Sequence, residues 1–219
     1  MSKNIALLID WENLRREIIR LQRRRILTSS QLNYNNPDHI YNLVTFLFKD
    51  ENKYNIFRIF FYTAFPLEKE EIKKLVQYRR DISFERYEEY YNNHQYQIEN
   101  MINLSKRSFK ELNKKDKVAI RLGNLQIQSQ KNDGNLVFVQ KKVDMLLGLD
   151  TAHLSYNKIV DEIVFFCKDK DLSPAFKLAR INGLNVSIVD IGGINISEHI
   201  YKHIDKVYKI SSSELKNLN

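Results

Sequence analysis

Four aspartates stand at positions where a carboxylate is uncommon. Five apolar residues run up to Asp10, a second apolar segment ends in Asp169 and Asp171, and Asp144 falls near the start of an expected helix. Asp is depleted in strands and is seldom buried unless it is paired. Several such acids at one place repel one another unless a hard cation lies among them, and oxygen ligands suit Mg2+ or Mn2+. The four aspartates therefore predict a metal site.

The elements that must position these acids are the strands of a parallel sheet. Short apolar runs of this kind are typical of fully buried strands. The expected strands are residues 5–9, 55–63, 163–166 and 183–191. Ligands of open α/β sheets bind at the C-terminal ends of the strands, where Asp10 would lie. Ser173 is the expected N-cap of the next helix, so Asp169 and Asp171 would occupy a strand-to-helix loop.

A helix expected over residues 143–154 carries Asp144 in its first turn, where the helix dipole favours an anion. Asp150 follows six residues later. Since each helical residue turns by about 100°, Asp150 lies on a different face from Asp144. Only Asp144 is therefore expected at the metal site.

Basic residues flank the same positions. The helix expected to begin at Asn13 carries six arginines and one acid, Glu17. Arginine holds phosphate through its fork of donors, although a solvated helix face is the alternative explanation. The residues predicted to contact nucleic acid are Arg15, Arg16, Arg20, Lys141, Lys142 and Lys168.

Residues 67–117 predict helices that carry both signs of charge and many tyrosines. Interleaved arginines and aromatics could stack on single-stranded bases. Packing between helices, or in the seam of a homodimer, is the preferred interpretation. A strand over residues 118–128, a turn at 132–135 and a short strand at 136–139 predict a hairpin, and a helix is expected at 196–204.

Composition sets further limits on function. The chain has 219 residues, a net charge of +8 and one cysteine, Cys167. The charge favours a polyanionic partner such as nucleic acid, although a Lys- and Asn-rich composition would also produce it. One cysteine forms no intramolecular disulfide, and no apolar run approaches the roughly 20 residues of a membrane span. No secretory signal is visible, so we expect a cytoplasmic protein that binds no membrane.

Three motifs, in this order, resemble the NYN domain family, the LabA-like branch of the PIN-like nucleases. They are D-x-x-N at Asp10 and Asn13, K-x-V-D at Lys141–Asp144, and D-x-D at Asp169 and Asp171. The resemblance covers Ile5 to about Ile210, apart from residues 67–117. Two positions depart from the family pattern: Lys142 stands where the family has glycine, and Cys167-Lys168 stands in place of Ser-Gly.

This resemblance implies an α/β fold, a PIN-like three-layer sandwich with a mainly parallel central sheet and a helical insertion. Residues 1–210 would form one domain, with the insertion at about 67–117 and a polar tail at 211–219. It implies a metal-dependent ribonuclease in which Asp10, Asp144, Asp169 and Asp171 hold Mg2+ or Mn2+. Asn13 would bond a ligating carboxylate or a phosphate oxygen. The substrate would be single-stranded or structured RNA.

Three alternatives stay open. An inactive NYN module could bind RNA or a protein partner, with the Lys168 ammonium standing where a metal would lie. A phosphatase of the haloacid dehalogenase type also begins with a strand and Asp, but it needs a second Asp two residues later, where Glu12 stands. The acids could also be ordinary loop residues and helix caps.

Overall fold

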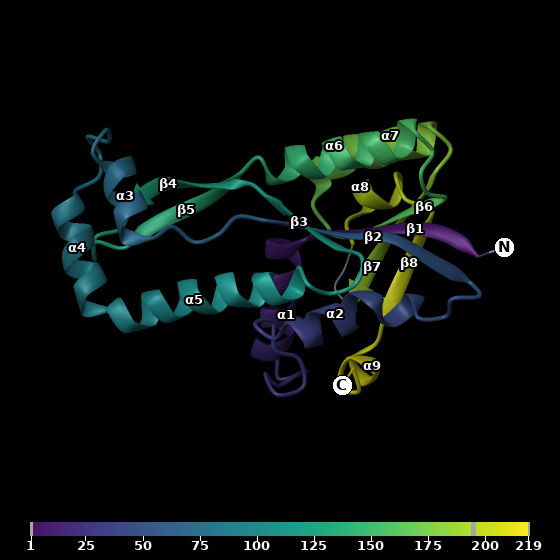
Figure 1. The fold of residues 1–219 in the computed structure, drawn as a ribbon, viewed down its shortest axis with the longest axis horizontal. Coiled ribbons are helices and arrows are strands. Elements are labelled where there is room, and N and C mark those ends of the chain that lie inside the picture. The colour runs from purple at the N-terminus through teal and green to yellow at the C-terminus, as the bar shows by residue number, and fades with distance from the viewer. Residues whose placement is uncertain (1, 194–195, 219) are drawn as a thin grey trace.

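The computed structural model describes residues 2–193 and 196–218. Its centre is a six-stranded, wholly parallel sheet with the strand order β3-β2-β1-β6-β7-β8 (Figure 1). The strands are β1 (Lys3–Asp10), β2 (Tyr54–Thr63), β3 (Val118–Leu122), β6 (Glu162–Phe166), β7 (Asn185–Ile191) and β8 (Lys206–Ile210). Helices cover both faces, which confirms the predicted α/β three-layer sandwich.

Alternation along β1 explains why the sheet is covered on both sides. Ile5, Leu7 and Ile9 face one core, whereas Ala6 and Leu8 face the other, and all five are fully buried. The first core is closed by α1 (Trp11–Arg23), α2 (Pro37–Thr45) with the 3-10 turn η1 (Phe46–Phe48), and α9 (Ser212–Leu215). The second is closed by α6 (Val143–Tyr156), α7 (Ser173–Ile181), which follows the 3-10 turn η2 (Lys170–Leu172), and α8 (Glu198–Tyr201).

An arm extends from the β3 side of the sheet (Figure 1). It consists of α3 (Lys69–Val76), α4 (Phe84–Asn93), α5 (Gln95–Leu112) and the antiparallel hairpin β4 (Asn124–Gln130) and β5 (Leu136–Lys141). A small core of its own joins α3 and α4 to the hairpin, and it includes Tyr87 and Tyr91. At the other end of α5, Phe109 packs edge-on against Trp11, with 5.2 Å between the ring centroids. The arm is therefore anchored beside the start of α1.

The arginines of the arm hold its parts together. Arg79 donates to the carbonyl oxygen of Ile127, and Arg86 donates to the carbonyl oxygens of Lys131 and Asn132. Because Tyr87 and Tyr91 are buried in the core of the arm, the tyrosines of residues 67–117 serve in part for packing, as the preferred interpretation predicted. Tyr78 and Tyr96 remain exposed.

The strand predicted over residues 118–128 is in fact two strands in two sheets. The chain divides at Gly123, where a Cβ would lie 2.6 Å from the carbonyl oxygen of Lys141. Only glycine allows the β3–β4 link to approach the end of β5 so closely. The first half therefore pairs with β2 in the central sheet, and the second half enters the hairpin.

Three smaller expectations are wrong. The residues expected as a fraying polar tail form α9 and bury Leu215 and Leu218 in the first core. The helix expected over residues 196–204 is limited to the single turn α8. Ser173 does not cap α7, because the η2 turn leads directly into that helix and the Ser173 hydroxyl donates to the carbonyl oxygen of Lys170 at 2.5 Å. Among the described helices, none has both the length and the apolar character to cross a bilayer.

Candidate functional site

Asp10 ends the central strand and caps the helix that follows. Its Oδ1 accepts from the Asn13 backbone N–H at 3.1 Å, and the Asn13 side-chain amide donates to Oδ2 at 3.4 Å. The Cys167 thiol, on the neighbouring strand end, is 3.7 Å from the same Oδ2. The D-x-x-N motif is thus a helix cap, and the two side chains hold each other in place.

Asp144 reaches this edge from the arm. The hairpin returns the chain through Lys141 and Lys142 into α6, whose first turn carries Asp144 as predicted. Asp144, Lys141 and Lys142 are all exposed. Lys142 has a positive φ of 70°, the left-handed region that glycine adopts most easily. The position where the family pattern has glycine is therefore a position whose backbone favours glycine.

We expect Lys142→Gly to stabilise the fold by about 0.5–1 kcal/mol, because it relieves a strained lysine backbone at some cost in chain entropy. The Lys142 side chain is exposed, so little packing is lost. Urea titration would measure the change. Lys141→Gly is the matched control, since Lys141 ends a strand and glycine there should destabilise. Destabilisation by Lys142→Gly as well would contradict the assignment of strain.

Asp169 and Asp171 lie in the loop after β6, also as predicted. Asp169 Oδ1 accepts from the Asp171 backbone N–H at 2.9 Å and so caps the η2 turn. Asp171 is exposed at the start of that turn. The structure therefore brings acids from β1, from α6 and from the β6–η2 loop to one edge of the sheet.

These acids influence one another electrostatically. Burial raises the pKa of Asp10 above its ordinary value, and the Asp144 carboxylate raises it further against the hydrogen bonds from Asn13. Partial burial raises the pKa of Asp144, and the Asp169 and Asp171 carboxylates add to this shift. A nearby cation would offset this repulsion of Asp10 and Asp144 by neighbouring carboxylates.

The donor chemistry fits an oxygen-preferring cation, but the placement of the donors is incomplete. Within residues 2–193 and 196–218, no group of three or more His, Cys, Asp or Glu side chains is positioned to hold a metal ion. The acids share an edge without converging on one point. Side chains of the four aspartates would have to move to complete a shared ligand set.

The position of Lys168 contradicts the prediction that it contacts nucleic acid. Its ammonium is buried in ion pairs and not presented to solvent, because it lies 2.7 Å from Asp190 Oδ1 and 3.0 Å from Glu17 Oε1. The side chains of Lys168 and Asp190 are each 8% exposed, and that of Glu17 is 13% exposed. Burial raises the pKa of Glu17, although the Lys168 charge opposes the shift. This buried ion triad joins α1, β7 and the loop that carries Asp169.

Two of the predicted phosphate-binding arginines are engaged within α1. Arg15 donates to both oxygens of Glu12 at 2.9 Å, and Arg16 Nε donates to Glu12 Oε1 at 2.8 Å. Burial alone would raise the pKa of Glu12, but these arginines lower it. Arg16, with a side chain 73% exposed, still reaches solvent, as does Arg20. The α1 surface therefore keeps a basic face beyond its first turn.

Sequence reasoning missed the triad partners Glu17 and Asp190. Asp190 ends the apolar strand β7 as Asp10 ends β1, so the same signal could have identified it. Cys167 is buried, and that burial raises the pKa of the thiol well above its ordinary value. Asp150, kept apart from the site by helical phase, accepts from Tyr62 Oη at 2.9 Å and Arg121 Nε at 2.8 Å.

No family model and no curated protein matches the chain. A solved structure of a protein of unknown function from Vibrio parahaemolyticus is similar over 96% of this chain and 94% of its own, with 11% sequence identity and a TM-score of 0.49. A similarity at this level carries no argument about function.

Proposed function

We propose that the protein is a divalent-cation-dependent nuclease acting on RNA. One observation carries the proposal: acids from three separate elements lie at the C-terminal edge of a parallel sheet, where neighbouring carboxylates help to raise the pKa values of Asp10 and Asp144. The choice of RNA rests on the resemblance to NYN domains. The net charge of +8 suits a polyanion of either kind.

The four aspartates would have different roles, because the structure holds Asp10 more firmly than the other three. Asp10 is 6% exposed and fixed by Asn13, so it provides a rigid anchor. Asp144, Asp169 and Asp171 are more accessible and would close around the site when substrate binds. A cation held there would supply Lewis-acid polarisation of the phosphodiester and an acidified water. The exposed Arg16, Arg20, Lys141 and Lys142 would hold the RNA backbone.

Mn2+ should raise the melting temperature of the protein, because an ion that binds only the folded state must stabilise it. At a concentration 100 times its Kd the gain is about 2.7 kcal/mol, or roughly 5–10 °C for a chain of this size. Asp144→Asn should abolish the shift and Glu89→Gln, an exposed acid on the arm, should preserve it. An identical Mn2+ shift in both variants would place the ion elsewhere.

Cleavage of a labelled single-stranded RNA pool tests the reaction itself. We expect cutting with Mn2+ or Mg2+, none with EDTA, and loss of cutting in Asp144→Asn but not in Glu89→Gln. Asp144 is exposed, so its replacement should leave the fold intact. Metal-independent cutting, or cutting unaffected by Asp144→Asn, would overturn the nuclease proposal.

The second candidate is a binding module that does not cut. The absence of a ready three-ligand group among the described residues favours it. The sequence suggested for this candidate that the Lys168 ammonium stands where a metal would lie. The structure does not support that suggestion, because Lys168 pairs with Glu17 and Asp190. RNA binding without cleavage and without an Mn2+ shift would establish this candidate. A phosphatase role is weakened further because Glu12 is held by Arg15 and Arg16.

A further inference from the structure

A groove runs along α7 on the face of the sheet opposite α1. It consists of two adjoining hollows of about 460 and 570 Å³, which share Lys177 and His203 in their linings. One hollow begins at Lys170 and Asp171, beside the candidate site. The other ends at residues 183–185, where β7 starts at the opposite edge of the sheet. We call this continuous depression the α7 groove.

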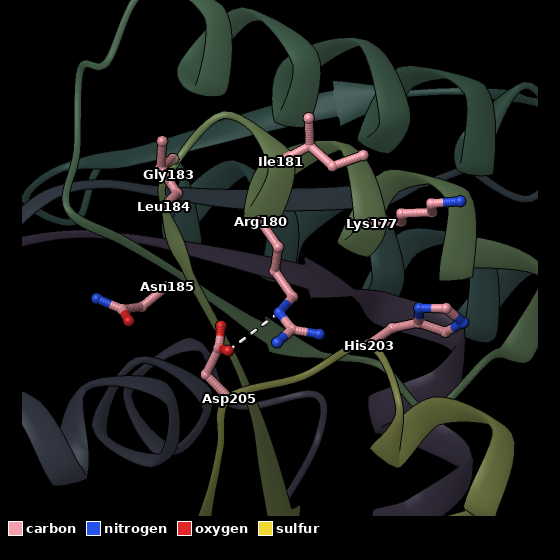
Figure 2. Close-up of a pocket in the computed structure, with 8 residues that line it drawn as sticks. All are labelled: Lys177, Arg180, Ile181, Gly183, Leu184, Asn185, His203 and Asp205. Carbon is pink, nitrogen blue, oxygen red and sulfur yellow. Dashed lines mark ion pairs between the residues drawn. The ribbon is translucent and has the colours of Figure 1, made fainter.

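Cationic side chains are spaced along the α7 groove. Lys170 lies at one end, Lys177 is shared by both hollows, and Arg180 follows one helical turn later. Figure 2 shows Arg180 extending from α7 toward Asp205, with Lys177 and His203 on its other side. Arg180 Nε is 3.0 Å from Asp205 Oδ1, so the Asp205 carboxylate partly neutralises the charge of Arg180. Lys170 and Lys177 have no such acidic partner among the ion pairs of the described residues.

His199 and Ser173 do not make a nucleophile in the α7 groove. The Ser173 hydroxyl has one proton, which it donates to the carbonyl oxygen of Lys170 at 2.5 Å. In the hydrogen bond of 3.2 Å between Ser173 Oγ and His199 Nδ1, the histidine nitrogen must then be the donor. Because His199 does not accept the serine proton, the groove is suited to binding and not to acyl transfer.

The shape and charge of the groove fit an extended anion. A nine-residue helix is about 13 Å long, and cations spaced along it match successive charges of a chain better than a single compact anion. Phosphate contacts by lysine and arginine position a strand without reading its sequence. The groove also begins at Asp171, one of the proposed catalytic acids, so a strand in the site continues into it.

We propose that the α7 groove holds the phosphate backbone of single-stranded RNA on one side of the scissile bond. The inference rests on the proposed function for its substrate class. It assigns Lys170, Lys177 and Arg180 as backbone-binding residues, on a face of the molecule that the arginine-rich α1 does not share. The RNA would thus be held on both sides of the acids.

Binding of a fluorescent single-stranded oligouridine to the full chain, measured by anisotropy in EDTA, tests this inference independently of cleavage. Lys177→Glu should weaken binding about five- to tenfold and reduce the slope of log affinity against log salt by about 0.7 per lost phosphate contact. Lys49→Glu is the matched control, since it makes the same charge change at an exposed lysine next to η1 and should have little effect.

A second variant should act in the opposite direction. Asp205→Asn removes the acid that faces Arg180 and keeps an oxygen that can accept from the Val186 N–H, so it should tighten binding severalfold. Equal effects of Lys177→Glu and Lys49→Glu in variants with unchanged melting curves would overturn the groove assignment even if the protein cuts RNA. Groove-dependent binding without any cleavage would sustain it while overturning the nuclease.

Discussion

Replacing Asp10 with Asn should remove cleavage and stabilise the protein. We expect a loss of activity greater than about 100-fold, because even residues that only support metal ligands contribute 10- to 100-fold. Asparagine caps a helix as well as aspartate does, so the bond from the Asn13 N–H survives. The buried charge, which burial and Asp144 disfavour, disappears. Thermal melts and RNA cleavage on the same preparation would show both effects.

The pH dependence of this stabilisation has a definite sign. The pKa of Asp10 is raised in the folded state, so its favourable contribution is present below the ordinary value of 3.8 and is lost as pH rises through the raised pKa. Asp10→Asn should therefore exceed the wild type in stability at neutral pH and approach it near pH 4. Asp10→Ala is the control, since it loses the cap at a cost of about 1 kcal/mol. An Asp10→Asn protein less stable than wild type at neutral pH would contradict the burial argument.

Lys168→Met should be among the most destabilising single substitutions in the chain. It would leave Glu17 and Asp190 as two buried carboxylates without the ammonium between them. Removal of one partner from a buried ion pair costs about 3–5 kcal/mol. For a chain of this length the melting temperature should fall by roughly 6–20 °C.

The matched comparison uses the neighbouring lysine. Lys170 is exposed, so Lys170→Met should change the free energy of unfolding by less than about 0.5 kcal/mol. Adding Asp190→Asn to Lys168→Met should restore part of the loss, because one of the two buried carboxylate charges is removed. If the Lys168→Met and Lys170→Met proteins had the same melting temperature, the triad would have no stabilising role.

The sequence was sufficient to predict the strands β1, β2, β6 and β7 of the central sheet and the edge at which the acids lie. Apolar runs ending in Asp10 and Asp169 are strong local signals, and the helix phase correctly separated Asp150 from Asp144. The division at Gly123 could not be predicted, because it depends on the approach of Lys141 from a segment 18 residues away. Pairing of Lys168 with Asp190 is likewise a tertiary contact, and a lysine beside acids in sequence gave no indication that it faces away from them. Whether acids at a shared edge converge on a cation depends on side-chain geometry, which sequence spacing does not specify.

The strand order also determines when the chain can fold during synthesis. β1 is made before both of its neighbours in the sheet, and one of them, β6, is separated from it by more than 150 residues. Until β6 leaves the ribosome, one edge of a strand whose central residues 5–9 are all apolar stays unpaired, and unpaired edges invite aggregation. Such long-range pairing slows folding, since loop closure precedes the contacts that stabilise it. The cysteine that contacts Asp10 immediately follows β6, so the edge that carries the acids is completed only after the chain has grown 157 residues beyond Asp10.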